Sequence, residues 1–194
     1  MTKHFAVLLA VIVLISGCGI FETRQPQPPQ QGRTDFLPPT SPDIVIQNLV
    51  NSIADRNVDN YIACLSDTSF GARIFTFVPP ADVYNQYRSI FFNWDKNSER
   101  AYFNNFISQS LNSSSSALIL SSENLTFQGD SATYNANYTL LWPNKVPGYP
   151  QQAQGNLQFS LGIDRNQNWS IYRWIDSRVG DSLTWSEMKA RFSQ

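Results

Sequence analysis

The spacing of apolar residues changes once along this chain of 194 residues. From residue 42 to residue 111 apolar residues recur at intervals of three and four, as in Ile46, Leu49 and Ile53, which is the repeat of an amphipathic helix. From residue 132 to residue 163 they alternate with polar residues, which is the repeat of a strand buried on one face. Helices followed by an antiparallel run of three or four long strands predict an α+β roll, in which a curved sheet wraps around the helices.

Capping residues and turns locate the individual elements. We expect helices over residues 42–56, 59–66, 81–94, 98–111 and 184–192, the fourth capped by Ser98 and the last opened by a capping box from Thr184 to Glu187. We expect strands over residues 73–78, 132–142, 157–163 and 169–175, and polar turns at residues 128–131 and 164–168 indicate an antiparallel meander. In the last strand, the alternation predicts that Trp169, Ile171 and Ile175 face away from Tyr172 and Trp174.

The first 17 residues have the pattern of a secretory signal. Lys3 precedes an unbroken run of eleven apolar residues from Phe5 to Ile15, and the small residues Ser16 and Gly17 follow. Eleven residues fall short of the ~20 that a helix needs to span a bilayer. They fit the apolar region of a signal peptide, and two small residues suit a cleavage site.

The sequence Ile15-Ser16-Gly17-Cys18 resembles the lipobox of bacterial lipoproteins. The resemblance implies that a diacylglycerol is attached to the Cys18 thiol, that the chain is cleaved before this residue, and that the new amino group is acylated. It also implies the outer membrane, on its periplasmic or surface face, because Gly19 stands where an Asp favours retention in the inner membrane of diderm bacteria.

Residues 18–42 differ in composition from the rest of the chain. Six of the eleven prolines lie between Gly19 and Pro42, among Gln, Thr and Arg residues. Such a segment cannot bury enough apolar surface to fold. We therefore expect a leader over residues 1–17, a lipidated tether over residues 18–42 and a single domain over residues 43–194.

Composition excludes several kinds of chemistry. The single histidine, His4, lies in the leader, so the mature protein has no imidazole for a catalytic triad or a metal site. Cys64 is then the one thiol left, and its helical spacing with Tyr61 and Leu65 predicts a buried apolar side chain. Basic residues are scattered and the formal net charge is −1, which disfavours nucleic acid as a partner. We expect no metal and no cofactor.

The order of elements resembles the nuclear transport factor 2-like superfamily, which includes SnoaL-like cyclases, ketosteroid isomerases and many binding domains. The resemblance covers residues 43–178 and depends on the helical pair from Ile44 to Ser66, the aromatic helix from Ile90 to Trp94 and the closing strand from Trp169 to Trp174. It implies a cone-shaped, cystatin-like roll. Residues 181–189 are similar to the ends of uncharacterised envelope lipoproteins of this shape.

Two functions follow from this resemblance. The first is a non-catalytic module, lipid-anchored to the membrane, that holds a small apolar ligand or an envelope protein in or beside the cone; superfamily members often pair through their sheets, which allows a homodimer. The second is an isomerase-like or dehydratase-like enzyme that uses Asp176 as its base. Its partner would be a tyrosine hydroxyl, from Tyr134, Tyr138 or Tyr172.

Asp176 also has a structural interpretation, an ion pair with Arg178 or Arg173 near the end of a strand. The two functions differ in whether a buried carboxylate opens onto a cavity.

Overall fold

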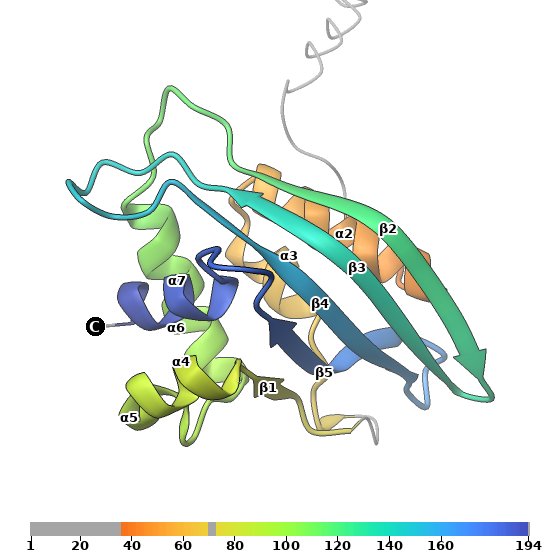
Figure 1. Cartoon of the computed structure of the whole chain (residues 1–194). Coiled ribbons are helices and arrows are strands. Elements are labelled where there is room, and N and C mark those ends of the chain that lie inside the picture. Colours follow the sequence, from red (N-terminus) through yellow and green to blue (C-terminus); the bar gives the residue numbers. More distant parts are fainter. Residues whose placement is uncertain (1–35, 70–72, 194) are drawn as a thin grey trace, which may run out of the picture. The chain divides into compact units, whose positions relative to one another are not determined.

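The computed structural model of the protein describes residues 36–69 and 73–193 (Figure 1). The leader and the predicted lipidation residue Cys18 lie outside the described residues. The elements follow the chain in this order: α2 (Pro42–Ala54), α3 (Val58–Ala63), β1 (Thr76–Val78), α4 (Ala81–Gln86), α5 (Arg88–Phe91), α6 (Lys96–Ser108), β2 (Ala117–Gln128), β3 (Ser131–Leu141), β4 (Gln152–Ile163), β5 (Trp169–Ser177) and α7 (Trp185–Phe192). The predicted α+β class is confirmed.

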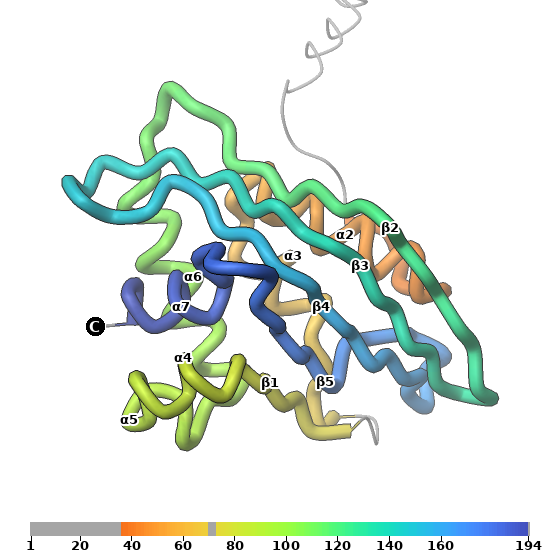
Figure 2. Tube along the Cα trace, in the orientation of Figure 1, coloured from red at the N-terminus to blue at the C-terminus, as the bar shows by residue number. Residues whose placement is uncertain are grey.

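The five strands form one sheet in the order β1-β5-β4-β3-β2. Strands β2 to β5 pair with their neighbours in antiparallel fashion, and the short β1 adds in parallel to β5. The path of the chain through this meander can be followed in Figure 2. The meander predicted from the polar turns is therefore confirmed, and the sheet curves around the helices.

Helix α2 shows why the apolar spacing was informative. Its N-cap Ser41 accepts a hydrogen bond from the Ile44 amide (3.4 Å), and Pro42 occupies the first turn, where its missing N–H is not needed. Leu49 and Ile53 on the predicted stripe are fully buried, and the helix packs on β2 and β5. Figure 1 views β2 and β3 from the face opposite α2.

Two predicted helices differ from the structure. The segment 81–94 is broken at Tyr87, whose φ of −118° and ψ of 37° separate α4 from α5. Helix α6 begins earlier than expected because Asp95, not Ser98, is its N-cap and accepts the Ser98 amide (2.8 Å).

Strand β2 lacks a clear alternation of buried and exposed residues because a bulge between Ser121 and Asn124 interrupts its register.

A second bulge, in β5, decides which side chains enter the core. Ser160 pairs with Arg173 and Leu161 pairs with Ile171, so Tyr172 is an extra residue in the strand. The shift turns Trp174 and Asp176 toward the helices, with 0% and 2% of their surface exposed. The predicted faces of Trp174 and Ile175 were therefore wrong, because one inserted residue reverses every later side chain.

The C-terminal helix α7 packs beneath the sheet. Thr184 and Glu187 form the predicted capping box, in which the Glu187 carboxylate accepts the Thr184 amide (2.8 Å) and the Thr184 hydroxyl accepts the Glu187 amide (3.3 Å). Trp185, Met188 and Ala190 are fully buried against the sheet and α6. Helix α7 is thus part of the core.

Candidate functional site

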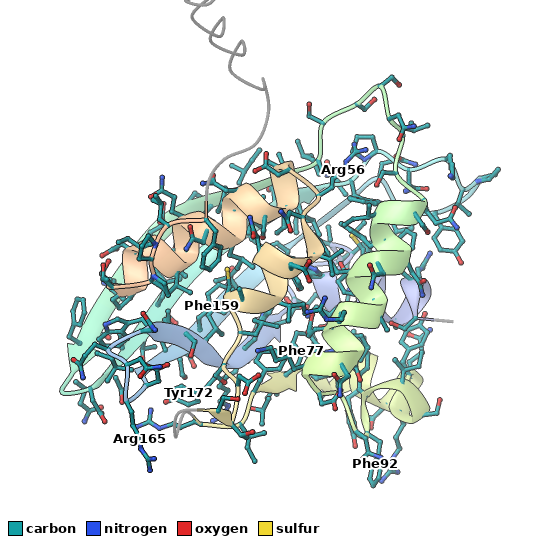
Figure 3. The ribbon with its side chains drawn as sticks, turned by 180° about the vertical axis from the view of Figure 1, so that it is seen from behind. Arg56, Phe77, Phe92, Phe159, Arg165 and Tyr172 are labelled. Atoms are coloured by element: carbon teal, nitrogen blue, oxygen red, sulfur yellow. The ribbon has the colours of Figure 1, made fainter. Side chains whose placement is uncertain are left out.

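Aromatic rings fill the space between the sheet and the helices. Trp174 of β5 meets Trp185 of α7 edge to face at 4.6 Å, and meets Phe159 and Phe77 in the same way at 5.1 and 5.6 Å between ring centroids. Figure 3, seen from the helix side, shows Phe77 and Phe159 within this space. The interior where the resemblance places a ligand is therefore occupied by the protein's own side chains.

Asp176 reaches the interior and bonds to three donors there. Its Oδ1 accepts the Tyr138 hydroxyl (2.8 Å), and its Oδ2 accepts the Ser186 amide (2.7 Å) and the Ser186 hydroxyl (2.5 Å). The Tyr138 oxygen in turn accepts the amide of Trp185 (2.7 Å). The carboxylate therefore joins β3, β5 and the first turn of α7.

Of the three candidate tyrosines, the structure brings one to Asp176. Tyr138 is its direct partner, whereas the Tyr134 hydroxyl donates to Glu123 (2.5 Å). Tyr172, the bulge residue, lies under the guanidinium of Arg73, 4.6 Å from the ring centroid.

The predicted pairing of Asp176 with an arginine is wrong. Arg178 pairs with Asp82 (2.8 Å) and Glu187 (3.1 Å), while Arg173 is exposed. The cause is the β5 bulge, which turns Asp176 inward. Arg178 instead links α4 and α7 to the end of β5 through its ion pairs with Asp82 and Glu187.

Burial changes the proton affinity of this network. Desolvation raises the pKa of the Asp176 carboxyl, and the hydrogen bonds from Ser186 and Tyr138 oppose that rise. Desolvation, together with the nearby Asp176 charge, also raises the pKa of Tyr138. A carboxyl with a raised pKa beside a tyrosine is the pairing of an isomerase base, and here both carboxylate oxygens of Asp176 are bonded to Tyr138 and Ser186.

A second buried site was not predicted from the sequence. Glu99 of α6 and Lys189 of α7 form an ion pair in which both side chains are fully buried. Glu99 also accepts the Trp94 indole N–H (2.7 Å) and the Tyr61 hydroxyl (2.8 Å). The signal was present: Glu99 precedes Tyr102, Phe103 and Phe106 on one apolar stripe, and Lys189 shares a stripe with Trp185 and Phe192.

The Lys189 ammonium sits in an aromatic box. It lies 3.9 Å from the ring centroid of Phe77 and 3.8 Å from that of Trp174, within the range of a cation–π contact. Desolvation lowers the pKa of Lys189 to about 8, although the Glu99 charge opposes the fall. The geometry is that of an ammonium-binding cage whose occupant is supplied by α7.

Other candidate residues have structural surroundings. Cys64 is buried, its thiol donates to the Asn60 carbonyl (3.3 Å), and burial raises its pKa. Across residues 36–69 and 73–193 there is no cluster of three or more acidic, cysteine or histidine side chains that could hold a metal ion. The helices in these two ranges are too short or too polar to cross a bilayer.

Hollows are found at the surface. Two of them, of about 440 Å³ and about 280 Å³, lie side by side on the face of the sheet opposite the helices and share Asn137 and Asn156 in their linings. A third, of about 290 Å³, lies beside Trp169 and Lys96.

Comparison with known proteins shows which structures share this fold. The sequence matches no protein-family model and no curated protein. Among solved structures, the chain is similar to a candidate aromatic ring hydroxylase from Novosphingobium aromaticivorans, with a TM-score of 0.56 and 14% identity over 84% of this chain and 99% of the other.

Two further structures carry the name of the superfamily. One is a nuclear transport factor 2-like protein from Salmonella enterica, with a TM-score of 0.51 and 14% identity over 71% of this chain and 89% of the other. The other is a candidate dehydratase of the same family from Streptomyces avermitilis, with a TM-score of 0.53 and 9% identity over 71% and 93%. At such identities the likeness concerns the fold alone: the domain has a nuclear transport factor 2-like fold.

Proposed function

We propose that the protein is a lipid-anchored component of the bacterial envelope whose domain binds a partner at its surface and catalyses no reaction. The observation that carries this proposal is the filled interior. Helix α7 occupies the cone, and the buried carboxylates Asp176 and Glu99 both bond to groups of the protein. A substrate would have to displace Trp185 and Lys189, which are fully buried.

The anchor rests on the leader and on Cys18. Two or three acyl chains on this residue would hold the protein on a membrane essentially without release. The 18 residues from Cys18 to Asp35 would reach about 55 Å in polyproline geometry at ~3.1 Å per residue. The chain then meets the domain at Leu37, whose amide donates to the Asn48 side chain (3.0 Å), and at Pro39, whose carbonyl accepts the Trp169 amide (2.7 Å).

Replacing the anchoring residue tests this part of the proposal. We expect Cys18→Ser, expressed in a diderm bacterium, to move from the membrane fraction to the soluble fraction or to remain as uncleaved precursor without lipid. Labelling with a radioactive fatty acid should mark the wild type and not the variant. Cys64→Ser is the matched control, because it removes the buried thiol and should leave fractionation and labelling unchanged. Lipid labelling that persists in Cys18→Ser would refute the anchor.

A second function deserves a test because of one contact. The hydrogen bond between Tyr138 and Asp176 is the arrangement that an isomerase or dehydratase of this fold would use. For such an enzyme to act, α7 would have to leave the cone. The Asp176 variants described in the Discussion separate the two functions.

A further inference from the structure

The face of the sheet opposite the helices carries amide side chains in place of charges. On β3 and β4 the residues that alternate with the buried ones include six amides: Asn135, Asn137, Gln152, Gln154, Asn156 and Gln158. Their neighbours on these two strands include Thr133, Thr139 and Ser160, and Gln152 pairs with Leu141 at the end of β3. Among the described strand residues of this face, the charged one is Arg173, which lies at one end and pairs with Ser160. We call the six residues the amide face.

These amides keep most of their hydrogen-bonding capacity. A side-chain amide offers two donors and two acceptor positions. Gln158 donates to Asn135 (2.9 Å), Gln154 to the Thr139 hydroxyl (3.4 Å), and Asn137 to the Ser122 hydroxyl (3.3 Å). Asn156 is exposed and has no side-chain partner among the described residues. Donors and acceptors on this face therefore remain open to a ligand.

The amide face is also hollowed. The two adjoining hollows of about 440 Å³ and about 280 Å³ meet at Asn137 and Asn156, which are direct cross-strand partners. One hollow is closed at its end by Val179 and Ser182, which follow β5. The seven residues of β4 from Gln152 to Gln158 span about 20 Å at ~3.3 Å per residue. The site is thus an elongated, uncharged trough.

The chemistry of the trough selects its ligand. An anionic or cationic partner would find almost no opposite charge there. The centre of a protein–protein interface is enriched in aromatic, Met and Arg residues, and the centre of this face holds amides. Neutral hydroxyl groups both donate and accept hydrogen bonds, as the amides do. Thr139 and Ser182 at the margins extend the same chemistry.

We propose that the amide face binds a neutral, hydroxyl-rich glycan chain laid along β3 and β4. This inference deepens the proposed function by naming the class of partner, and it rests on that function's claim that recognition occurs at the surface. An aromatic ring on which a sugar could stack is missing from the linings of both hollows except for Tyr138, whose hydroxyl is engaged with Asp176. We therefore expect a dissociation constant on the order of 1 mM for a short oligosaccharide.

Titration by nuclear magnetic resonance tests the proposal on the mature chain with Cys18 replaced by Ser. The probes are maltohexaose, cellohexaose and chitohexaose, with oligogalacturonate as the anionic comparison. We expect at least one neutral hexasaccharide to shift the backbone and side-chain amide signals of residues 135–139 and 154–158. The shifts should be unchanged when salt is raised, because charge plays no part.

Matched variants locate the site. Asn137→Ala combined with Asn156→Ala should weaken binding by about tenfold, because two hydrogen-bonding side chains are removed. Asn166→Ala, an exposed amide in the β4–β5 turn, should bind as the wild type does. A spectrum that keeps its dispersion in the double variant shows that the sheet is intact.

Three results would overturn the inference: no shift on the amide face with any neutral probe at about 10 mM, preference for oligogalacturonate, or a homodimer that covers the face. None of these results bears on the lipid anchor or on the filled interior, which are tested by separate experiments. Failure of the glycan proposal is therefore distinguishable from failure of the proposed function.

Discussion

Lys189→Met is expected to lower the free energy of unfolding by about 3–5 kcal/mol, because it leaves the Glu99 carboxylate buried without a countercharge. Two neutral donors, from Trp94 and Tyr61, would remain on that carboxylate, but they do not cancel its charge. Methionine fits beside the rings of Phe77 and Trp174, so loss of packing is a small part of the effect. Urea denaturation followed by circular dichroism measures the change.

The double variant Lys189→Met with Glu99→Gln isolates the cause. It removes both charges, and the new amide can accept from Trp94 through its oxygen and donate to the Tyr61 hydroxyl through its N–H. We therefore expect it to regain most of the lost stability. Lys145→Met, an exposed lysine, is the matched control and should change stability by less than about 0.5 kcal/mol. A double variant no more stable than Lys189→Met would show that the buried charge is not the cause.

Asp176→Ala is expected to cost about 4 kcal/mol, because the Tyr138 hydroxyl and two donors of Ser186 lose their acceptor within the core. Asp176→Asn should cost less, about 1–2 kcal/mol, because an amide oxygen can still accept from Ser186 while one donor near Tyr138 is left unmatched. The loss arises mainly from release of the first turn of α7. Amide hydrogen exchange of residues 185–189 should therefore speed up in both variants.

The same pair of variants separates the structural role of Asp176 from a catalytic one. An enzyme that uses this carboxylate as its base would keep its fold in Asp176→Asn and lose turnover. The structural account expects a large loss of stability in Asp176→Ala, whereas Asp181→Ala, at an exposed carboxylate, should leave stability unchanged. An Asp176→Ala protein as stable as the wild type would contradict the structural account.

The sequence predicted the class of fold because the two hydrophobic periods report directly on helices and on strands with one buried face. It also located the capping box of Thr184 and the turns of the meander. It could not reveal the bulge at Tyr172, since no local residue preference marks an inserted position. That single residue decides that Asp176 points into the core and pairs with Tyr138 and Ser186 rather than with an arginine.

The Glu99–Lys189 pair shows a second limit. Each residue lies on an apolar helix stripe, and such a position alone does not reveal whether a long charged side chain extends to solvent or is buried. Burial of these two side chains depends on the contact between α6 and α7. Glu99 and Lys189 are 90 residues apart in the sequence. Long-range pairing of this kind requires the three-dimensional arrangement.

The most direct test of the filled interior is the binding of benzene, followed by nuclear Overhauser effects between the ligand and core side chains. Trp185→Ala supplies the positive control, because removing a fully buried indole should leave a cavity of the kind that binds benzene. The account predicts no nuclear Overhauser effect between benzene and the methyl or ring protons of Met188, Phe159 and Trp174 in the wild type. It predicts clear nuclear Overhauser effects in the variant. Benzene bound among these residues in the wild type would contradict it.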